Sequence, residues 1–278
     1  MKVITKTAEL QRILSCGDTI ITGFVPTMGA LHEGHLSLVE RCRRECDLTV
    51  VSIFVNPTQF NDPGDLKNYP RTPERDRSLL EKAGVDVVFM PDVDEIYPEK
   101  DVRLFSFGHL DKVMEGEKRP GHFNGVAQIV SKLFDIVQPE KAYFGEKDFQ
   151  QLAIIRALIK KLGYNIEIVG CPIKRDGDGL ALSSRNVLLN PQQRQAAPLI
   201  YRVLSQAVGM KDEKSIEELC LWVTENIDRD PELKVEYFNI VDSLTLQPVK
   251  DWNENGEKYG CIAVKVGNVR LIDNLKFC

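Results

Sequence analysis

Hydrophobic residues up to about position 175 form short apolar runs that alternate with longer amphipathic stretches, the pattern of a parallel sheet covered by helices. The clearest strand is 48–55, LTVVSIFV, which is rich in β-branched residues and carries no charge. We predict strands over 20–25, 48–55, 85–90, 142–144 and 166–171, and helices over 34–46, 73–84, 124–137 and 149–162. This part is therefore expected to be an α/β domain.

The pattern changes after residue 186. Helices are predicted over 191–208 and 215–228, followed by strands over 234–241, 261–266 and 270–273, with a hairpin turn at Gly267-Asn268. We place the boundary in the polar stretch 174–179, which divides the chain into an α/β domain, 1–177, and a smaller α+β domain, 178–278.

Composition narrows the class of protein. The 278 residues suffice for two domains, and 43% hydrophobic with 28% charged residues is ordinary for a soluble globular protein. A net charge of only −5 argues against nucleic-acid or anionic-membrane partners, although a local basic pocket is still allowed. No apolar run has the length of a signal peptide core or of a membrane span, so we expect a cytoplasmic protein.

The seven cysteines are odd in number and scattered, at positions 16, 42, 46, 171, 220, 261 and 278. None forms a CxxC pair. We interpret them as reduced structural thiols rather than metal ligands or disulfides.

The first candidate for chemistry is Pro26–His35, PTMGALHEGH, between a predicted strand and a predicted helix. Gly29 permits a tight turn, and Gly34 lets the backbone approach a ligand closely. The free N–H groups and the dipole of the following helix suit a phosphate. His32 and His35 can both donate hydrogen bonds to an oxygen whose charge grows as a phosphoanhydride breaks. We predict a triphosphate-binding turn.

Other interpretations of the two histidines are open. His-Glu-Gly-His is one residue shorter than the zinc-protease spacing, and a structural zinc site would need ligands beyond His109 and His122, which lie in other contexts. Solvent-exposed histidines that merely cap the helix are the ordinary alternative.

Two further strings follow predicted strands, where open α/β sheets bind ligands. In VNPTQF, 55–60, the amides of Asn56 and Gln59 can hold hydroxyl and carboxylate groups, although Asn-Pro is also a common turn. In FGEKDFQQ, 144–151, Lys147 can neutralise phosphate, Asp148 can cap the helix or hold a cation, and Gln151 can face the same pocket. A capped surface helix is the alternative.

The fourth string is DGLALSSRN, 178–186, where two hydroxyls and a guanidinium form a candidate phosphate clamp that could close between domains. A plain linker is the alternative. Two lesser candidates are His122, either a core or capping residue or part of a pocket, and Asp76, either a surface acid or a magnesium ligand.

These four strings, in this order and over nearly the whole chain, resemble the pantothenate synthetase family. His32-Glu33-Gly34-His35 also resembles the His-x-Gly-His motif of the wider nucleotidyltransferase superfamily, and the Ser-Ser-Arg loop resembles its mobile second signature. The resemblance implies a Rossmann-like amino-terminal domain, a carboxy-terminal lid and a cytoplasmic homodimer. It also implies a ligase that condenses pantoate with β-alanine, using ATP and Mg²⁺, through an enzyme-bound pantoyl adenylate.

The resemblance also implies residue roles. His35, His32 and Lys147 would be catalytic, and Lys147, Ser183, Ser184 and Arg185 would contact the phosphates. The full ATP site would comprise Met28, Gly29, Ala30, Leu31, His32, Glu33, Gly34, His35, Gly145, Glu146, Lys147, Asp148, Lys174, Leu182, Ser183, Ser184 and Arg185. Pantoate and β-alanine would be held by Gln59, Gln151, Asn56, Arg119 and His122.

Three positions depart from the family pattern. Lys174 replaces a small apolar residue whose backbone meets adenine, and Leu182 replaces a methionine, a change that conserves volume. Asp76 matches an acidic position proposed for magnesium, but Arg75 beside it does not. Two other functions are weighed: nucleotidyl transfer to a phosphate ester, which has no obvious need for the amides of Gln59 and Gln151, and ATP binding without turnover.

Overall fold

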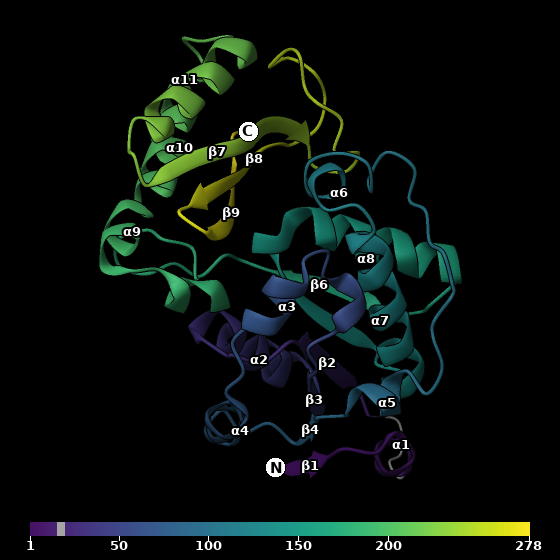
Figure 1. Cartoon of the computed structure of the whole chain (residues 1–278). Coiled ribbons are helices and arrows are strands. Elements are labelled where there is room, and N and C mark those ends of the chain that lie inside the picture. The colour runs from purple at the N-terminus through teal and green to yellow at the C-terminus, as the bar shows by residue number, and fades with distance from the viewer. Residues whose placement is uncertain (16–19) are drawn as a thin grey trace.

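The computed structural model describes residues 1–15 and 20–278. Its first part contains a six-stranded parallel sheet in the order β1-β4-β3-β2-β5-β6 (Figure 1). The strands are β1 (Lys2–Ile4), β2 (Thr22–Thr27), β3 (Leu48–Ile53), β4 (Val87–Phe89), β5 (Lys141–Gly145) and β6 (Glu167–Cys171). All five predicted strands are confirmed to within about two residues, whereas β1, with only three residues, was not predicted.

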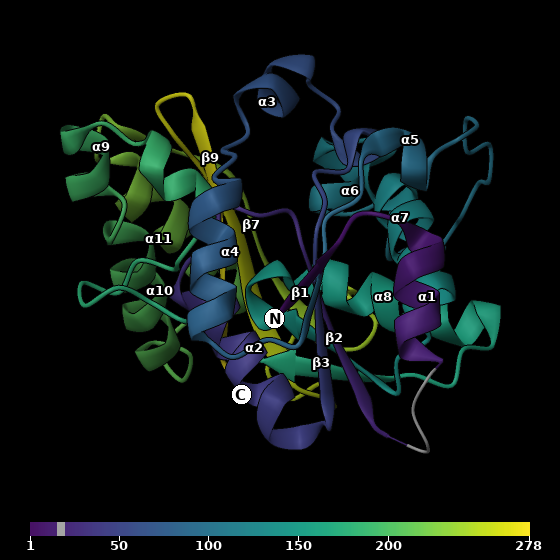
Figure 2. The same ribbon diagram turned by 90° about the horizontal axis from the view of Figure 1, so that it is seen from below.

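Helices cover both faces of this sheet, because side chains alternate between faces along each strand. On β2, Phe24 packs into one apolar cluster and Val25 into another. Figure 2 shows α1, α7 and α8 on one side of the strands and α2 and α4 on the other. These helices are α1 (Thr7–Leu14), α2 (Glu33–Glu45), α4 (Pro73–Lys82), α7 (His122–Val137) and α8 (Phe149–Leu162). An α/β layered fold is confirmed.

Shorter helical turns connect these elements. They are α3 (Pro63–Asn68), α5 (Val93–Ile96), α6 (Glu115–Lys118) and the 3₁₀ turns η1 (Pro57–Gln59), η2 (Glu146–Asp148) and η3 (Ser184–Leu188). The turn η1 begins shortly after β3 ends, and η2 begins directly after β5. The candidate strings 55–60 and 144–151 therefore lie where the chain leaves the sheet.

The carboxy-terminal part has its own apolar core, built between helices and an antiparallel sheet, β7-β8-β9. Its elements are α9 (Pro191–Ala196), α10 (Leu199–Gly209), α11 (Ile216–Asp228), β7 (Leu233–Asp242), β8 (Lys258–Val266) and β9 (Val269–Lys276). The hairpin at Gly267-Asn268 is confirmed, with Gly267 at φ 56°. The single helix predicted over 191–208 is wrong: it is two helices, because Pro198 lacks the N–H that a continuous helix requires.

The order of the parallel strands determines where a ligand can bind. The connections from β2 through β3 to β4 run toward one edge, while β5 pairs with the other side of β2 and β6 follows beyond it. The strand order therefore reverses between β2 and β5, and ligands of open α/β sheets bind outside the carboxyl ends at such a point.

The predictions about the cysteines and about membrane-spanning segments can be compared with the residues that the structure describes. Cysteines 42, 46, 171, 220, 261 and 278 are free thiols, as predicted, while Cys16 lies outside the described residues. In the part of the chain that the structure describes, none of the helices combines the length and apolarity needed to cross a membrane.

Candidate active site

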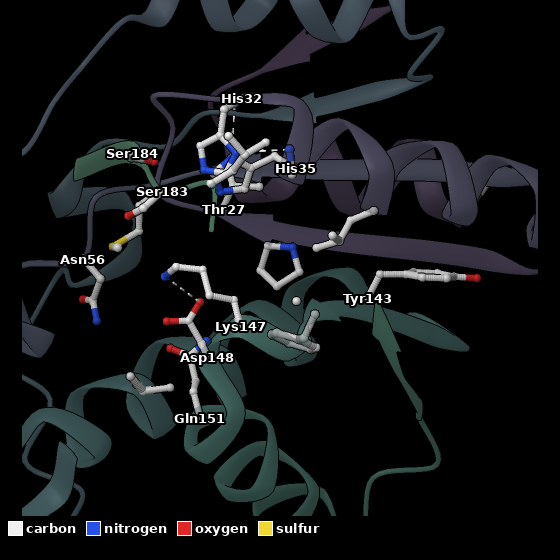
Figure 3. Close-up of a pocket in the computed structure, with 18 of the residues that line it drawn as sticks. Thr27, His32, His35, Asn56, Tyr143, Lys147, Asp148, Gln151, Ser183 and Ser184 are labelled. Atoms are coloured by element: carbon white, nitrogen blue, oxygen red, sulfur yellow. Dashed lines mark hydrogen bonds and ion pairs between the residues drawn. The ribbon is translucent and has the colours of Figure 1, made fainter. Parts of the chain in front are cut away.

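A pocket opens at the carboxyl ends of β2 and β5 and brings all four candidate strings together. Its hollow, including the open mouth, is about 1220 Å³. Figure 3 shows His32 and His35 on one side, facing Lys147, Asp148 and Gln151 across the pocket. The predicted residues that line it are Met28, His32, Gly34, His35, Asn56, Gln59, Gly145, Lys147, Asp148, Gln151, Lys174, Leu182, Ser183, Ser184 and Arg185.

The turn after β2 is held from behind by Asp76. Gly29 and Ala30 take the left-handed conformation, at φ 78° and 49°. The backbone N–H groups of Ala30 and Leu31 donate to the two oxygens of Asp76 at 2.9 and 2.8 Å. The Leu31 side chain is fully buried in an apolar cluster. Of the predicted ATP-site residues, Leu31 thus lies in the core, outside the pocket lining, and its N–H already has an acceptor.

Asp76 is neither a surface acid nor a good metal ligand. It is buried, and Thr72 adds a third hydrogen bond to its carboxylate at 3.0 Å. A cation at these oxygens would face the N–H groups of Ala30 and Leu31, whose positive ends point at the same place. No group of three or more His, Cys, Asp or Glu side chains within the described ranges could hold a metal. We interpret Asp76 as the support of the turn.

Replacing Asp76 by asparagine tests this interpretation. An amide can accept only on one oxygen, so a buried N–H loses its acceptor at a cost of about 1–3 kcal/mol. We expect urea unfolding to show that loss, and any nucleotide-dependent activity to fall at every magnesium concentration. Glu74→Gln, at an exposed position on the same helix, is the matched control. Recovery of Asp76→Asn by excess magnesium would instead indicate a metal ligand.

His32 and His35 present N–H donors to the pocket. Nδ1 of His32 accepts the Gly34 N–H at 3.1 Å, and Nδ1 of His35 accepts the His32 N–H at 3.4 Å, so the two rings form a reciprocal helix cap. Burial, followed by the charge of Lys147, lowers the pKa of His32 to about 4. Burial and the neighbouring His32 lower the pKa of His35 to about 3. Both rings are thus neutral at pH 7, and their proton lies on Nε2.

The capping interpretation of these histidines is therefore correct in part. They do cap α2, but both are only partly exposed and both line the pocket, unlike ordinary surface caps. Because the caps occupy Nδ1, the Nε2–H of each ring is left to donate to a ligand. Capping and ligand binding are carried by opposite nitrogens of the same rings.

The facing wall comes from the string after β5. Lys147 makes a long ion pair with Asp148, at 3.9 Å, and its side chain extends into the pocket (Figure 3). Asp148, the residue before α8, makes no capping hydrogen bond with its side chain, so the first of its two suggested roles, capping this helix, is wrong. Gln151, one turn into α8, lies beside them and lines the pocket. This wall supplies one cation, one carboxylate and one neutral amide.

Asn56 and Gln59 form a third wall of fixed amides. Asn56 is buried, and its Nδ2 donates to Gln59 Oε1 at 3.1 Å, while Tyr97 donates to its Oδ1 at 2.9 Å. Gln59 Nε2 is left facing Met28 and the pocket. Asn56 thereby determines which end of the Gln59 amide a ligand meets, and that end is a donor.

Arg119 and His122 support Gln59 from a smaller adjoining cavity rather than from the main pocket. Nε2 of His122 lies 3.2 Å from the Arg119 guanidinium, which can only donate. His122 must therefore carry its proton on Nδ1, which donates to the Gln59 carbonyl oxygen at 2.8 Å. Burial, followed by the charge of Arg119, lowers the pKa of His122 to about 4.

Acid should destabilise the protein through His122. Its folded pKa of about 4 lies below the ordinary value, so the unfolded chain takes up the proton first as the pH falls. The stability that this residue contributes is present above pH 6.5 and is lost toward pH 4, by up to about 1.4 kcal/mol per pH unit. His122→Asn keeps a donor for Gln59 without titrating. Urea unfolding from pH 7.5 to 4.5 should show a shallower decline for it, and equal slopes would contradict this account.

The string 178–186, which follows β6, closes the pocket through its residues 182–185. Ser184 donates to the Ala30 carbonyl oxygen at 3.1 Å, and Arg185 pairs with Asp65 at 2.9 Å. Ser183 accepts the Arg185 N–H at 3.3 Å. The Lys174 carbonyl accepts the Leu182 N–H at 2.9 Å. The four residues 182–185 all line the pocket, so a simple exposed linker does not describe this string.

Some predicted residues lie beside the pocket, and some lining residues were not predicted. Gly29, Ala30, Glu33 and Glu146 do not line it. Tyr69, Tyr143 and an apolar face of α7 do line it. Tyr69 packs under the Arg185 guanidinium, 5.4 Å from its ring centre. An apolar helix face has the same sequence pattern whether it meets a core or a pocket, so no signal could have distinguished α7.

Comparison with known proteins agrees with this geometry. The family model described as pantoate-beta-alanine ligase matches residues 2–276. A pantothenate synthetase of Porphyromonas gingivalis is 56% identical over 255 residues, covering 92% of this chain and 91% of that protein.

Solved structures of the same family are also similar to this chain over its whole length. The crystal structure of pantothenate synthetase from Thermus thermophilus has a TM-score of 0.93 and 46% identity, covering 100% of this chain and 99% of that one. A pantoate-beta-alanine ligase from Francisella tularensis, solved with beta-gamma ATP and β-alanine, has a TM-score of 0.85 and 36% identity, covering 100% and 98%. The chain belongs to the pantoate-beta-alanine ligase family.

Proposed function

We propose that this protein condenses pantoate with β-alanine, converting ATP to AMP and pyrophosphate. The observation that carries the proposal is the pocket itself: two neutral histidine donors and Lys147 on facing walls, beside the fixed amide of Gln59. Cationic and N–H donors suit a triphosphate, whereas a neutral amide suits a small hydroxy acid. Membership of the family supports the assignment of substrates.

The reaction has two steps. First, a carboxylate oxygen of pantoate attacks the α-phosphorus of ATP, the bond from that phosphorus to the bridging oxygen breaks, and pyrophosphate leaves. Second, the amine of β-alanine attacks the carbonyl carbon of the acyl adenylate, loses a proton and expels AMP. The cysteines are scattered and no enzyme nucleophile is needed, so positioning and charge stabilisation provide most of the rate.

Each wall has a part in the first step. The Nε2–H groups of His32 and His35 stabilise charge that grows on phosphate oxygens, and Lys147 neutralises charge from the opposite wall. Gln59 and Gln151 hold pantoate, with Asn56, Arg119 and His122 supporting Gln59. Ser183, Ser184 and Arg185 close over the nucleotide, and for this Arg185 must exchange Asp65 for a phosphate.

Magnesium is part of the proposal only as a companion of the nucleotide. Asp76 does not fit as its ligand, because both carboxylate oxygens accept backbone N–H groups. We propose that Mg²⁺ arrives bound to the phosphate oxygens of ATP, which are the hard ligands it prefers. None of the steps above depends on a metal held by the protein.

Exchange of labelled pyrophosphate into ATP tests the function. Exchange that requires pantoate supports acyl-adenylate formation. Exchange that requires a mononucleotide instead would identify a nucleotidyltransferase, and ATP binding without any exchange would identify a non-catalytic nucleotide-binding protein. Release of pantothenate on addition of β-alanine completes the assignment.

We propose a homodimer in the cytoplasm. The support for a dimer is the family and two large apolar side chains, Val102 and Leu104, which are 77% and 89% exposed. Exposed apolar groups that lie close together favour an interface. We expect sedimentation velocity to give about 63 kDa, twice the chain mass of 31.5 kDa. Leu104→Lys should weaken the dimer, while Lys67→Ala, at another exposed site, should not. A monomer at all concentrations would contradict the proposal.

A further inference from the structure

The loop that carries Lys147 lacks a local support. Asp148, the residue before α8, makes no side-chain capping hydrogen bond, and Gly145, the residue before η2, has no side chain that could make one. A short 3₁₀ turn without caps does not determine its own orientation strongly. Something outside the loop must therefore hold the backbone from which Lys147 extends into the pocket.

That support comes from the opposite domain. Nδ2 of Asn274, on β9, donates to the carbonyl oxygens of Glu146 and Lys147 at 2.9 and 3.1 Å. An amide nitrogen has two hydrogens, so each carbonyl receives one. Asn274 is only 4% exposed, and its side chain spans 127 residues of sequence to reach Lys147. The contact joins the last strand of the chain to the first domain.

The strand β9 also holds the segment that follows β6. β9 is the edge strand of its sheet, and in Figure 1 it lies toward the first domain. Asp273 pairs with both terminal nitrogens of Arg175, at 2.6 and 2.9 Å. Arg175 also donates to the Asn274 carbonyl oxygen at 3.3 Å. The segments that follow β5 and β6 are thus both fastened to β9, which fixes the position of Asn274 itself.

We propose that Asn274 is a positioning residue that orients Lys147 for phosphate binding in the adenylation step. It touches neither reacting atom and acts by fixing two consecutive carbonyls of the loop. Removing it leaves the charge of Lys147 but lets the ammonium group move away from its place. A displacement of about 1 Å can reduce a rate by about a hundredfold. This inference rests on the proposed function.

A double-mutant cycle on the full chain tests the inference. The measured quantity is kcat for pantoate-dependent pyrophosphate exchange, with KM for ATP and pantoate, in the parent, Asn274→Ala, Lys147→Ala and the double variant. We expect Asn274→Ala to lower kcat about tenfold or more, with an unchanged pantoate KM. In the Lys147→Ala background the same substitution should change kcat by less than about twofold, because the group it positions is absent.

Two further variants separate positioning from folding. Ile240→Val loosens the core of the same domain away from the pocket and should keep kcat within about twofold. Asn274→Leu has a similar shape but no donor for either carbonyl, so it should reproduce the loss and can replace Asn274→Ala if that variant does not fold.

The outcomes are distinct. Equal fold-losses in both backgrounds, an unchanged kcat in Asn274→Ala and Asn274→Leu, or an equal loss in Ile240→Val would each overturn the positioning role. A parent protein without pantoate-dependent exchange would overturn the proposed function and the inference with it. An active parent whose two substitutions multiply would overturn the inference alone.

Discussion

Replacing His35 by alanine is expected to lower the rate of pantoate-dependent exchange by about a hundredfold to a thousandfold. The ring presents its Nε2–H to the pocket, because Nδ1 accepts the His32 N–H and the pKa is lowered to about 3. A donor of this kind acts mainly on charge that develops in the transition state. The loss should therefore fall on kcat more than on the KM for ATP.

The same substitution removes a helix-capping acceptor, and the two effects must be separated. The loss of a cap costs about 0.5–2 kcal/mol of stability. Thermal unfolding of His35→Ala should reveal that part. His35→Glu retains an acceptor for the His32 N–H but offers no donor, so it should recover stability without recovering rate. Glu40→Ala, at an exposed position on the same helix, should change neither. A rate within a few-fold of the parent would show that His35 is not the proposed donor.

Replacing Lys147 by alanine is expected to have the second large effect, a loss of about a hundredfold or more in exchange rate. Its ammonium group lies across the pocket from the two histidines, and among the residues that the structure describes its one ion pair is with Asp148, at 3.9 Å. The KM for ATP should also rise, because the proposed function has this charge contact the phosphates both before and during the reaction.

Two variants make the Lys147 prediction specific. Lys147→Arg keeps the charge but replaces a compact ammonium group by a planar fork, so it should recover only part of the rate. Lys160→Ala removes the same charge from an exposed position on α8 and should leave the kinetics unchanged. Full recovery in Lys147→Arg would mean that charge alone matters, and equal losses at both positions would indicate a general electrostatic effect.

Periodicity predicted most of the first domain correctly, for a physical reason. The central strands alternate between two apolar faces, as Phe24 and Val25 do, and the sequence records such burial directly. Prediction was wrong at Pro198, where apolar spacing continues through a residue that cannot continue a helix. It was silent at β1, which is too short to carry a pattern.

For the candidate site, the structure agrees with the sequence-based expectation at some residues and differs from it at others. Local strings proposed His32 and His35 from a glycine turn before a helix, and the structure places both at the pocket. Lys147 also lines it, although its string alone fitted a capped surface helix equally well. They misled about Asp76, whose neighbours in sequence are exposed while its carboxylate lies buried under Ala30 and Leu31. They carried no information on Asn274, since its side chain bonds carbonyl groups that are 127 and 128 residues away in sequence.

What the sequence by itself determined is most of the elements and the four strings, three of which follow predicted strands. The alternation of apolar residues, helix caps and turns each depend on residues that are close together in sequence, so they can be predicted from one sequence. Only the tertiary structure decided which nitrogen of each histidine faces the pocket, and that Asp76 and Asn274 support it from 45 and 127 residues away. Hydrogen bonds over such separations arise from how the elements pack, and packing leaves no local pattern to read.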